Sequence, residues 1–520
     1  MTTLSDRLAG LPASRLQGIR RGIEKESLRA HPDGRLALTP HPAALGSPLT
    51  HPHITTDFSE SLVEMVTGVH GSVASCLTEL THIHQVVYQE MARLGDEMLW
   101  VSSMPCRLPT DENIPLGVYG TSNVGRAKSV YRMGLGHRYG RRMQTISGIH
   151  YNWSMPGIDS DAYFGLIRNF RRNAFLLMVL FGASPALSSD FVAGREHTLQ
   201  PLGSDSVHLP YATSLRMGRL GYQSDAQATL AVSYNCLESY ADSLEEALTQ
   251  PYPTYEAIGI RNPGGEYNQL ATTLLQIENE FYGTIRPKRV IASGERPLHA
   301  LRERGVEYVE VRLMDLDPFQ TIGIQADTAR LLDVFLLHCL LSDSPPDTPD
   351  EIAALKRNQN LTAERGREPG LRLERGGAQV LLSQWAEDLL SQYVPIATAL
   401  DAVAGGQDYG RTVAEAQAAI RNLESLPSAR VLQTIEQRHG GSFVDFIRER
   451  SRQTQQVLLQ SPYPPELARR FERLAVESLE NQRRLEAGDH VPFETFRQQY
   501  LAPDRLGLAS PALPDAQVAI

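Results

Sequence analysis

The chain has 520 residues, of which 42% are hydrophobic and 21% are charged. This length fits one large domain with an appended part, or two domains, and the composition is typical of a soluble protein with a substantial core. The net charge of −10 argues against nucleic acid as a partner, because the phosphate backbone would repel the protein.

No segment predicts a membrane or secreted protein. The first residues, MTTLSDRLAGLPASRLQ, lack the apolar stretch of a signal peptide. The longest apolar run, residues 174–183, has about half the length needed to span a bilayer. The cysteines are scattered without the spacing of a zinc site, at Cys76, Cys106, Cys236 and Cys339. We therefore expect a cytoplasmic protein with reduced thiols and no membrane partner.

Periodic patterns predict both strands and helices over the first 320 residues. Strands are expected at 21–28, 62–66, 144–154 and 308–313, and helices at 75–97, 159–180 and 327–341. The strands come between helices at irregular intervals, without a regular β-α alternation. This order favours an α+β fold over a doubly wound parallel sheet.

The pattern becomes helical after about residue 375. Helices are expected at 381–401, 412–424, 442–459 and 465–486, with loops of Gly, Asp and Pro between them. The last residues are rich in Ala and Pro and are expected to be disordered. We therefore divide the chain into an α+β domain at 1–375, a helical region packed on it at 376–502, and a tail at 503–520.

Carboxylates recur at short spacing in three segments of the α+β part. The segments are GIEKESL, TTDFSESLVEM and EYVEVR, whose acids are Glu24, Glu26, Asp57, Glu60, Glu64 and Glu310. On a strand, Glu24 and Glu26 share one face with their Cα atoms about 6.6 Å apart. Such a pair needs a positive charge between its members unless it lies on a solvated edge. Hard oxygen ligands of this kind suit Mg²⁺ or Mn²⁺.

Basic residues are concentrated in a segment that contains no acid, residues 113–158. Its cations are Arg126, Lys128, Arg132, Arg138, Arg141 and Arg142. They indicate a surface that binds anions, although pairing with acids from elsewhere in the chain is equally open. The phrase YGTSNVGR has the glycine spacing of a Walker A loop but lacks its Lys-Ser/Thr, so it is not that motif.

Two further features bear on the chemistry. The segment QTISGIHYNWS alternates, which places His150 on a polar face as a minor metal ligand or, more commonly, a structural residue. Arg216 and Arg312 lie in other segments, and arginines can hold carboxylates or phosphates in two-point contacts. Acids for metals together with arginines for anions match a phosphoryl-transfer site.

Together these segments resemble the bacterial glutamate–cysteine ligases (γ-glutamylcysteine synthetases) of the type 1 class. The resemblance runs from about residue 18 to 370 and lies in long phrases in the family's order, such as GIEKESLR, ITTDFSESLVEM, YGTSNVGRAKSVYRMGLGHRYG, MQTISGIHYN and EYVEVRLMDLDPF. It is weaker through the C-terminal helices. The resemblance implies a glutamine-synthetase-like fold, with a curved antiparallel sheet, flanking helices and a helical C-terminal part.

The resemblance also implies an activity and its site. The enzyme would join the γ-carboxyl of L-glutamate to the amine of L-cysteine through γ-glutamyl phosphate, using ATP, as the first step of glutathione biosynthesis. Mg²⁺, or alternatively Mn²⁺, would be held by Glu24, Glu26, Asp57, Glu64, His150 and Glu310. Arg312 would meet the ATP phosphates, and Arg216 the glutamate and the transferred phosphoryl group. The cysteine pocket would draw on Tyr131, Arg132, Ile146, Tyr222 and Tyr282.

Three alternatives stay open on the sequence. A related ligase would join glutamate to a different small amine with the same metal and ATP residues. A two-metal hydrolase of phosphate esters also uses carboxylates and arginines, but it would need no amino acid. A metabolite sensor without catalysis is the third. In each case we expect a monomer whose partners are small molecules, and no pattern identifies a base for the amine proton.

Overall fold

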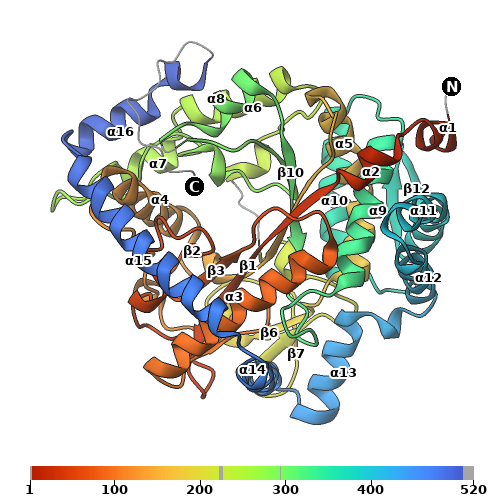
Figure 1. The fold of residues 1–520 in the computed structure, drawn as a ribbon, viewed down its shortest axis with the longest axis horizontal. Helices are drawn as coiled ribbons and strands as arrows, with labels where there is room; N and C mark the ends of the chain where they lie inside the picture. The colour runs from red at the N-terminus through yellow and green to blue at the C-terminus, as the bar shows by residue number, and fades with distance from the viewer. Residues whose placement is uncertain (1–2, 222–225, 293, 508–520) are drawn as a thin grey trace.

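The centre of the structure is an antiparallel β-sheet (Figure 1). The structure is a computed structural model and describes residues 3–221, 226–292 and 294–507. Seven strands form the sheet in the order β2-β3-β1-β5-β10-β9, with β4 paired to the end of β1. Their bounds are β1 Arg20–Ala30, β2 Ile54–Thr56, β3 Leu62–Val66, β4 Met98–Leu99, β5 Ile149–Ser154, β9 Ile285–Lys288 and β10 Tyr308–Met314.

The register of the strands gathers polar residues on one face of the sheet. Glu24 lies opposite His150, and Glu26 lies opposite Glu64. Glu310 is on the same face, because its partner on β5 is two residues from His150. We call this side of the sheet the acid face.

The other face of the sheet is apolar and packs against three long helices. Tyr151, Trp153 and Val309 point to this side and are fully buried. The covering helices are α3 Val73–Leu94, α5 Ser160–Phe181 and α9 Ala326–Leu341. The core therefore lies behind the sheet, which leaves the opposite face for charged side chains.

Seven further helices belong to the described residues of the first part. They are α1 Leu4–Ala9, α2 Ala13–Gln17, α4 Asn123–Tyr139, α6 Leu237–Thr249, α7 Pro253–Ile258, α8 Pro297–Arg304 and α10 Pro349–Arg365. The predicted helices at 75–97, 159–180 and 327–341 correspond to α3, α5 and α9, each within three residues at both ends. Helix α4 was not predicted, because Gly125, Gly134 and Gly136 interrupt its apolar pattern.

The C-terminal helices pack around the first part at several places rather than forming a separate body (Figure 1). They are α11 Leu382–Ala404, α12 Asp408–Arg421, α13 Pro427–His439, α14 Phe443–Gln460, α15 Pro465–Gly488 and α16 Phe493–Leu501. The predicted division at residue 375 falls inside a hairpin of β11 Arg372–Arg375 and β12 Ala378–Leu381. The predicted tail begins with a 3-10 helix, Pro503–Leu506, and its residues 508–520 lie outside the described residues.

The predicted strand at 144–154 is wrong in its first half. Met143–Thr145 form a 3-10 helix, and β5 begins only at Ile149. The physical reason lies in the hydrogen bonds before Gly148: the backbone N–H groups of Gln144 and Thr145 close the 3-10 turn, and that of Ser147 donates to the carbonyl oxygen of Ser103, outside the sheet. Ile146 therefore does not share the strand face of His150. At Gly148 the backbone passes so close to Arg216 that a Cβ atom would lie 2.0 Å from the guanidinium.

The predicted α+β class is confirmed, with an open antiparallel sheet, flanking helices and a helical C-terminal part. A smaller three-stranded sheet consists of β6 Ala186–Ser188, β7 Gln200–Pro201 and β8 Ser206–His208. Within the residues that the structure describes, no helix is long and apolar enough to cross a membrane.

Candidate active site

Three predicted metal ligands lie together at the middle of the acid face. One ligand atom each from Glu24, His150 and Glu310 lies within 4.8 Å of the others. His150 Nδ1 is 3.1 Å from Glu24 Oε2, and 4.0 Å from Glu310 Oε1. Burial opposes ionisation of Glu24, but the hydrogen bond with His150 and the charge of Lys288 contribute to a net lowering of its pKa. Burial and the charge of Arg312 lower the pKa of His150, so its imidazole is neutral at pH 7.

The tautomer of His150 follows from this geometry. Since Glu24 is ionised, Nδ1 carries the proton and donates it to the carboxylate. The lone pair of Nε2 is then available. This atom is buried, makes no hydrogen bond among the described residues, and lies 3.9 Å from Glu26 Oε1. A buried nitrogen that accepts no hydrogen bond is typical of a side chain that binds a metal cation.

Glu26 and Glu64 form a second acidic pair next to this cluster. They are direct neighbours across β1 and β3, and Asp57 follows β2 nearby. Burial and the charge of Asp57 raise the pKa of Glu26 to about 8. Burial and the surrounding carboxylates raise the pKa of Glu64 well above its usual value. A bound cation would remove both effects, because its charge favours the ionised carboxylates.

Cations of the protein surround Glu310 on the other side. Its carboxylate lies 2.9 Å from Arg312, 3.2 Å from Lys288 and 4.0 Å from Arg286. Although burial opposes ionisation, Lys288 and Arg312 lower the pKa of Glu310 well below its usual value. The acid face therefore changes from negative at β3 and β1 to positive at β9 and β10. A face of this kind can hold divalent cations beside phosphate groups.

Arg216 reaches the same region from the 3-10 helix Leu215–Met217 and is fully buried. Its guanidinium donates a 2.8 Å hydrogen bond to the carbonyl oxygen of Arg312. It also lies 3.8 Å from Asp315, whose carboxylate accepts hydrogen bonds from Ser184 and Ser214. The two predicted catalytic arginines are thus brought together, and Asp315 holds one of them in place.

The four predicted cysteine-pocket residues that the structure describes come from three separate segments. Tyr131 and Arg132 lie on α4, and Arg132 donates to the carbonyl oxygen of Asp57. Ile146 is buried in an apolar cluster against which both Tyr131 and Tyr282 pack. The Tyr282 hydroxyl accepts a 2.7 Å hydrogen bond from the Gln144 amide. Tyr222, also predicted here, lies outside the described residues.

Most arginines of the basic segment have partners inside the protein. Arg138 forms a buried ion pair with Glu280 at 2.9 Å, and Arg142 pairs with Asp111 at 3.0 Å. Arg141 donates to backbone carbonyls. Internal pairing therefore accounts for these three residues, and Arg132 is the one that reaches Asp57 beside the acid face.

Sequence reasoning missed Asp315 and the role of Lys288. TIRPKR stands out as a basic segment, but the pairing of Lys288 with Glu310 and of Asp315 with Arg216 joins residues that are far apart along the chain. The alternation of Arg286 and Lys288 in TIRPKR was the available signal, since it places both on one strand face. Glu60, by contrast, is a structural acid that accepts hydrogen bonds from the backbone of His41 and Val118.

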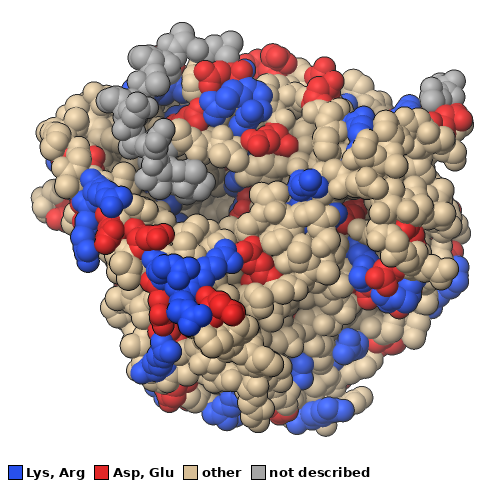
Figure 2. Space-filling model, viewed as in Figure 1, with Lys and Arg blue, Asp and Glu red and all other residues tan. Residues whose placement is uncertain are grey.

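The surface agrees with a site near the middle of the molecule. Figure 2 shows a hollow near the centre of this face, between the positions of β1 and β10 in Figure 1, with acidic and basic side chains beside it.

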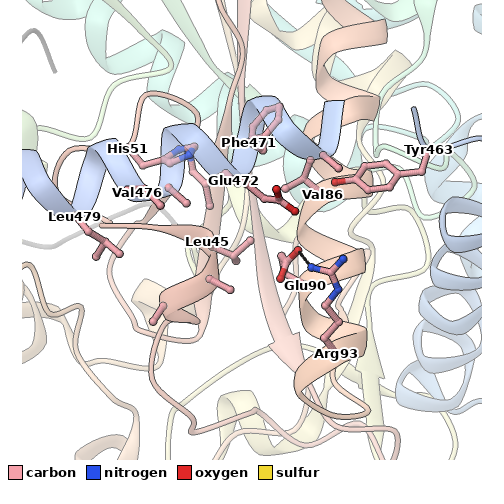
Figure 3. Close-up of a pocket in the computed structure, with 15 residues that line it drawn as sticks. Leu45, His51, Val86, Glu90, Arg93, Tyr463, Phe471, Glu472, Val476 and Leu479 are labelled. Atoms are coloured by element: carbon pink, nitrogen blue, oxygen red, sulfur yellow. Dashed lines mark hydrogen bonds and ion pairs between the residues drawn. The ribbon is translucent and has the colours of Figure 1, made fainter. Parts of the chain in front are cut away.

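A different cavity, of about 260 Å³, lies between α3, α15 and residues 43–54 (Figure 3). It is lined by Val86, Phe471 and the Glu90–Arg93 ion pair, and none of the described candidate residues reaches it.

The cysteines take no part in the site that the structure describes. All four are free. Cys106 is fully buried, and burial together with the charge of Asp190 raises the pKa of its thiol. A thiol in this state is a poor nucleophile.

Acid-lined sheet faces with adjoining arginines are typical of enzymes that act on nucleotides with divalent cations. Comparison with known proteins is consistent with this class. The family model for glutamate–cysteine ligase matches residues 9–362. A glutamate–cysteine ligase of Pseudomonas aeruginosa is 47% identical over 507 residues, which cover 94% of this chain and 95% of that protein. The chain therefore belongs to the glutamate–cysteine ligase family.

Further similarities extend along the chain. A glutamate–cysteine ligase of Alcanivorax borkumensis is 45% identical over 510 residues, covering 94% of this chain and 96% of that protein. A crystal structure of glutamate–cysteine ligase from Francisella tularensis in complex with AMP has a TM-score of 0.89 and 35% identity, covering 94% and 98% of the two chains. A bifunctional glutathione synthetase from Pasteurella multocida shares the fold, with a TM-score of 0.70 at 24% identity over 91% of this chain and 57% of that one.

Proposed function

We propose that this protein is an ATP-dependent glutamate–cysteine ligase that forms γ-glutamylcysteine, ADP and phosphate, the first step of glutathione biosynthesis. The observation that carries the proposal is the acid face itself, on which a cation-ligand cluster adjoins Arg216 and Arg312 in a chain of this family. The second amino acid would bind beside α4, where the apolar cluster of Ile146 and the guanidinium of Arg132 adjoin the acid face.

Two groups of ligands on the acid face suit divalent cations. Carboxylates with one neutral imidazole favour Mg²⁺, with Mn²⁺ as an acceptable substitute. The residues that would hold the ions are Glu24, Glu26, Asp57, Glu64, His150 and Glu310. When bound, the ions neutralise the charge of the ATP phosphates and polarise the transferred phosphoryl group. The bare Nε2 of His150 and the facing carboxylates of Glu26 and Glu64 fit this role.

The first step is a phosphoryl transfer. An oxygen of the glutamate γ-carboxylate attacks the γ-phosphorus of ATP, and the bond to the β-γ bridging oxygen breaks, so that ADP leaves with that electron pair. Arg312 would contact the phosphates, and Arg216 the glutamate and the transferred group. Both guanidiniums are held before substrate arrives, one by Glu310 and the other by the backbone and Asp315.

The second step forms the amide bond. The neutral amine of cysteine attacks the carbonyl carbon of γ-glutamyl phosphate, phosphate leaves with the electrons of the C–O bond, and the proton that the nitrogen loses passes to the departing phosphate. Tyr131, Arg132, Ile146, Tyr222 and Tyr282 would surround the cysteine. Because one methyl or hydroxyl difference changes binding in a small apolar pocket by only about 1–3 kcal/mol, we expect slow use of amines of similar size.

The remaining properties follow from this activity. The reaction needs ATP and a reduced thiol, so we infer that the enzyme works in the cytoplasm. All ligands assigned to the acid face come from one chain, which supports a monomer as the working unit.

The test is ADP release from the purified protein with Mg²⁺ and ATP, while glutamate and cysteine are omitted in turn. We expect release that requires glutamate and rises sharply with cysteine, together with γ-glutamylcysteine by mass spectrometry. If glutamate suffices and cysteine adds nothing, the amine must be a different one. ADP release that is indifferent to both amino acids would refute the ligase and favour phosphate-ester hydrolysis.

A further inference from the structure

The end of the helical C-terminal part contacts α4 by hydrogen bonds. We define residues 482–501, from the last turns of α15 through α16, as the C-terminal arm. The backbone N–H of Thr121 donates a 2.8 Å hydrogen bond to Glu486 Oε1, and that of Asn123 donates to the Asp489 carboxylate. In Figure 1 α15 and α16 run beside α4 at the left of the molecule. The arm lies beyond the residues that the family model matches.

Apolar contacts join α16 to the middle of α4. The Arg126 guanidinium lies 4.4 Å from the centre of the Phe493 ring. Phe493, Ala127 and Leu270 form a buried cluster, and Tyr131 packs against it. Tyr131, which is proposed to line the cysteine pocket, therefore packs against a cluster to which the arm contributes Phe493.

The opposite side of α4 faces the site. Arg132 donates to the carbonyl oxygen of Asp57, and its guanidinium lies 3.9 Å from the Asp57 carboxylate. Tyr131 also packs against the apolar cluster that contains Ile146. Helix α4 is thus held between the arm on one side and the acid face with its adjoining pocket on the other.

Helix α4 depends on such support. It contains Gly125, Gly134 and Gly136, and glycine is a weak helix former. Its N-terminus has Ser122 as a cap, and the backbone N–H groups that remain need further acceptors. The Asp489 carboxylate accepts from the N–H of Asn123, the first residue of the helix, and Glu486 accepts from the N–H of Thr121, just before the cap. Both carboxylates also interact favourably with the positive end of the helix dipole.

We propose that the C-terminal arm positions the acceptor side of the active site by holding α4, with Asp489 and Phe493 as positioning residues. The inference rests on the proposed function, because it takes Tyr131 and Arg132 as part of the cysteine pocket. The arm bonds to α4, whereas the proposed donor site is formed by β1, β5 and β10. Loosening the arm should therefore weaken the use of cysteine more than the use of glutamate or ATP.

The experiment measures KM for each substrate in full-length Asp489→Ala, with Asp445→Ala as the matched control. Asp445 is an acid in the first turn of α14, also in the C-terminal part, and pairs with Arg448. We expect Asp489→Ala to raise KM for cysteine about 3- to 10-fold while KM for glutamate and ATP stays within about twofold. Phe493→Leu, which keeps an apolar contact but removes the ring under Arg126, should act in the same direction.

Hydrogen–deuterium exchange gives an independent readout. In Asp489→Ala the amides of residues 121–135 should exchange faster, and those of β1 and β5 should not change. Equal changes in all three KM values, or none, would overturn the inference and leave the arm a merely stabilising element. Wild-type protein in the same assay separates the two proposals, because failure of the function would appear there as the absence of cysteine-dependent ADP release.

Discussion

Glu26 and Glu64 face each other across neighbouring strands, and such an arrangement costs stability unless a cation compensates it. Their raised pKa values have the same cause, since burial and nearby carboxylates both favour the protonated forms. Residues that only stabilise a fold are not arranged in this way. At the level of single residues, the acid face is therefore better explained by ligand binding than by folding.

His150 is the residue on which the metal assignment can be tested most simply. His150→Ala removes the bare Nε2 atom while the carboxylates stay in place, so affinity for Mn²⁺ should fall about tenfold or more. The measurement is a titration of free Mn²⁺ by electron paramagnetic resonance. His439→Ala, a half-buried histidine near Glu449, is the control. An affinity equal to that of the wild type would remove His150 from the site.

Asp315 should act through Arg216. Asp315→Asn removes the negative charge beside the guanidinium, so we expect kcat to fall about tenfold or more through loss of transition-state stabilisation. Affinity for Mn²⁺ should stay unchanged. The control is Asp317→Asn, whose carboxylate accepts a hydrogen bond from the backbone of Phe319. Steady-state kinetics would contradict this role if both variants behaved alike.

The charged residues differ in how far the sequence predicts them. Glu24, Glu26 and Glu310 stand out because two-residue spacing on a strand places side chains on one face. Asp315 and Lys288 belong to the site through ion pairs with residues more than 20 positions away in the sequence. The periodicity of a segment does not detect such pairs. The family resemblance predicted that these segments come together in one site. The hydrogen bonds that orient each side chain could be seen only in the structure.

At the scale of elements, a buried network joins the back of the sheet to two helices. The Asp333 carboxylate on α9 pairs with Arg21 of β1 at 3.0 Å. It also accepts hydrogen bonds from the hydroxyls of Tyr151 on β5 and Tyr409 on α12. The first strand of the acid face and a C-terminal helix therefore share one buried carboxylate.

Removing that carboxylate should destabilise the whole chain. Asp333→Ala leaves the Arg21 charge buried without its partner, so we expect a loss of about 3–5 kcal/mol in the free energy of unfolding. Asp327→Ala breaks more exposed pairs with Arg330 and Arg411 and should cost much less. Denaturant unfolding monitored by circular dichroism measures both. A loss no greater than that of Asp327→Ala would mean that the network contributes little.

The long helices and the central strands were predictable because their apolar periodicity is regular. The approach to β5 was not, because Gln144–Gly148 alternate like a strand while Met143–Thr145 form a 3-10 helix and the backbone of Ser147 bonds to Ser103, outside the sheet. Helix α4 was missed for a related reason, since its three glycines weaken the local signal and its support comes from Asp489 and Phe493. Tertiary contacts override local preference at both places.

At the scale of the whole molecule, buried histidines make stability depend on pH. Burial and neighbouring charges lower the pKa of His51 to about 3 and that of His41 to about 4. In the unfolded chain these values return to about 6.5. The contribution of these two histidines to stability is therefore fully present above pH 6.5 and is lost as the pH falls, because the unfolded state then binds protons that the folded state does not.

His51 tests this dependence. Its ring stacks on Phe471 of α15, and both residues are labelled in Figure 3. Its Nδ1 accepts hydrogen bonds from the backbone N–H groups of His53 and Ile54. At pH 5 the lowered pKa of His51 reduces the free energy of unfolding by about 2 kcal/mol relative to neutral pH. His51→Asn keeps an acceptor without titrating, so its melting temperature should fall less between pH 7.5 and pH 5 than that of the wild type. An equal fall in melting temperature in both proteins would mean that other groups cause the loss of stability in acid.

The central claim is that this protein activates glutamate by phosphoryl transfer on the acid face. Glutamate labelled with ¹⁸O in its γ-carboxylate tests it most directly, in a reaction with ATP, Mg²⁺ and cysteine followed by mass spectrometry of the phosphate. The account predicts one ¹⁸O atom in each phosphate released, because the attacking oxygen leaves with the phosphoryl group. Phosphate without ¹⁸O, formed while ATP is consumed, would contradict it.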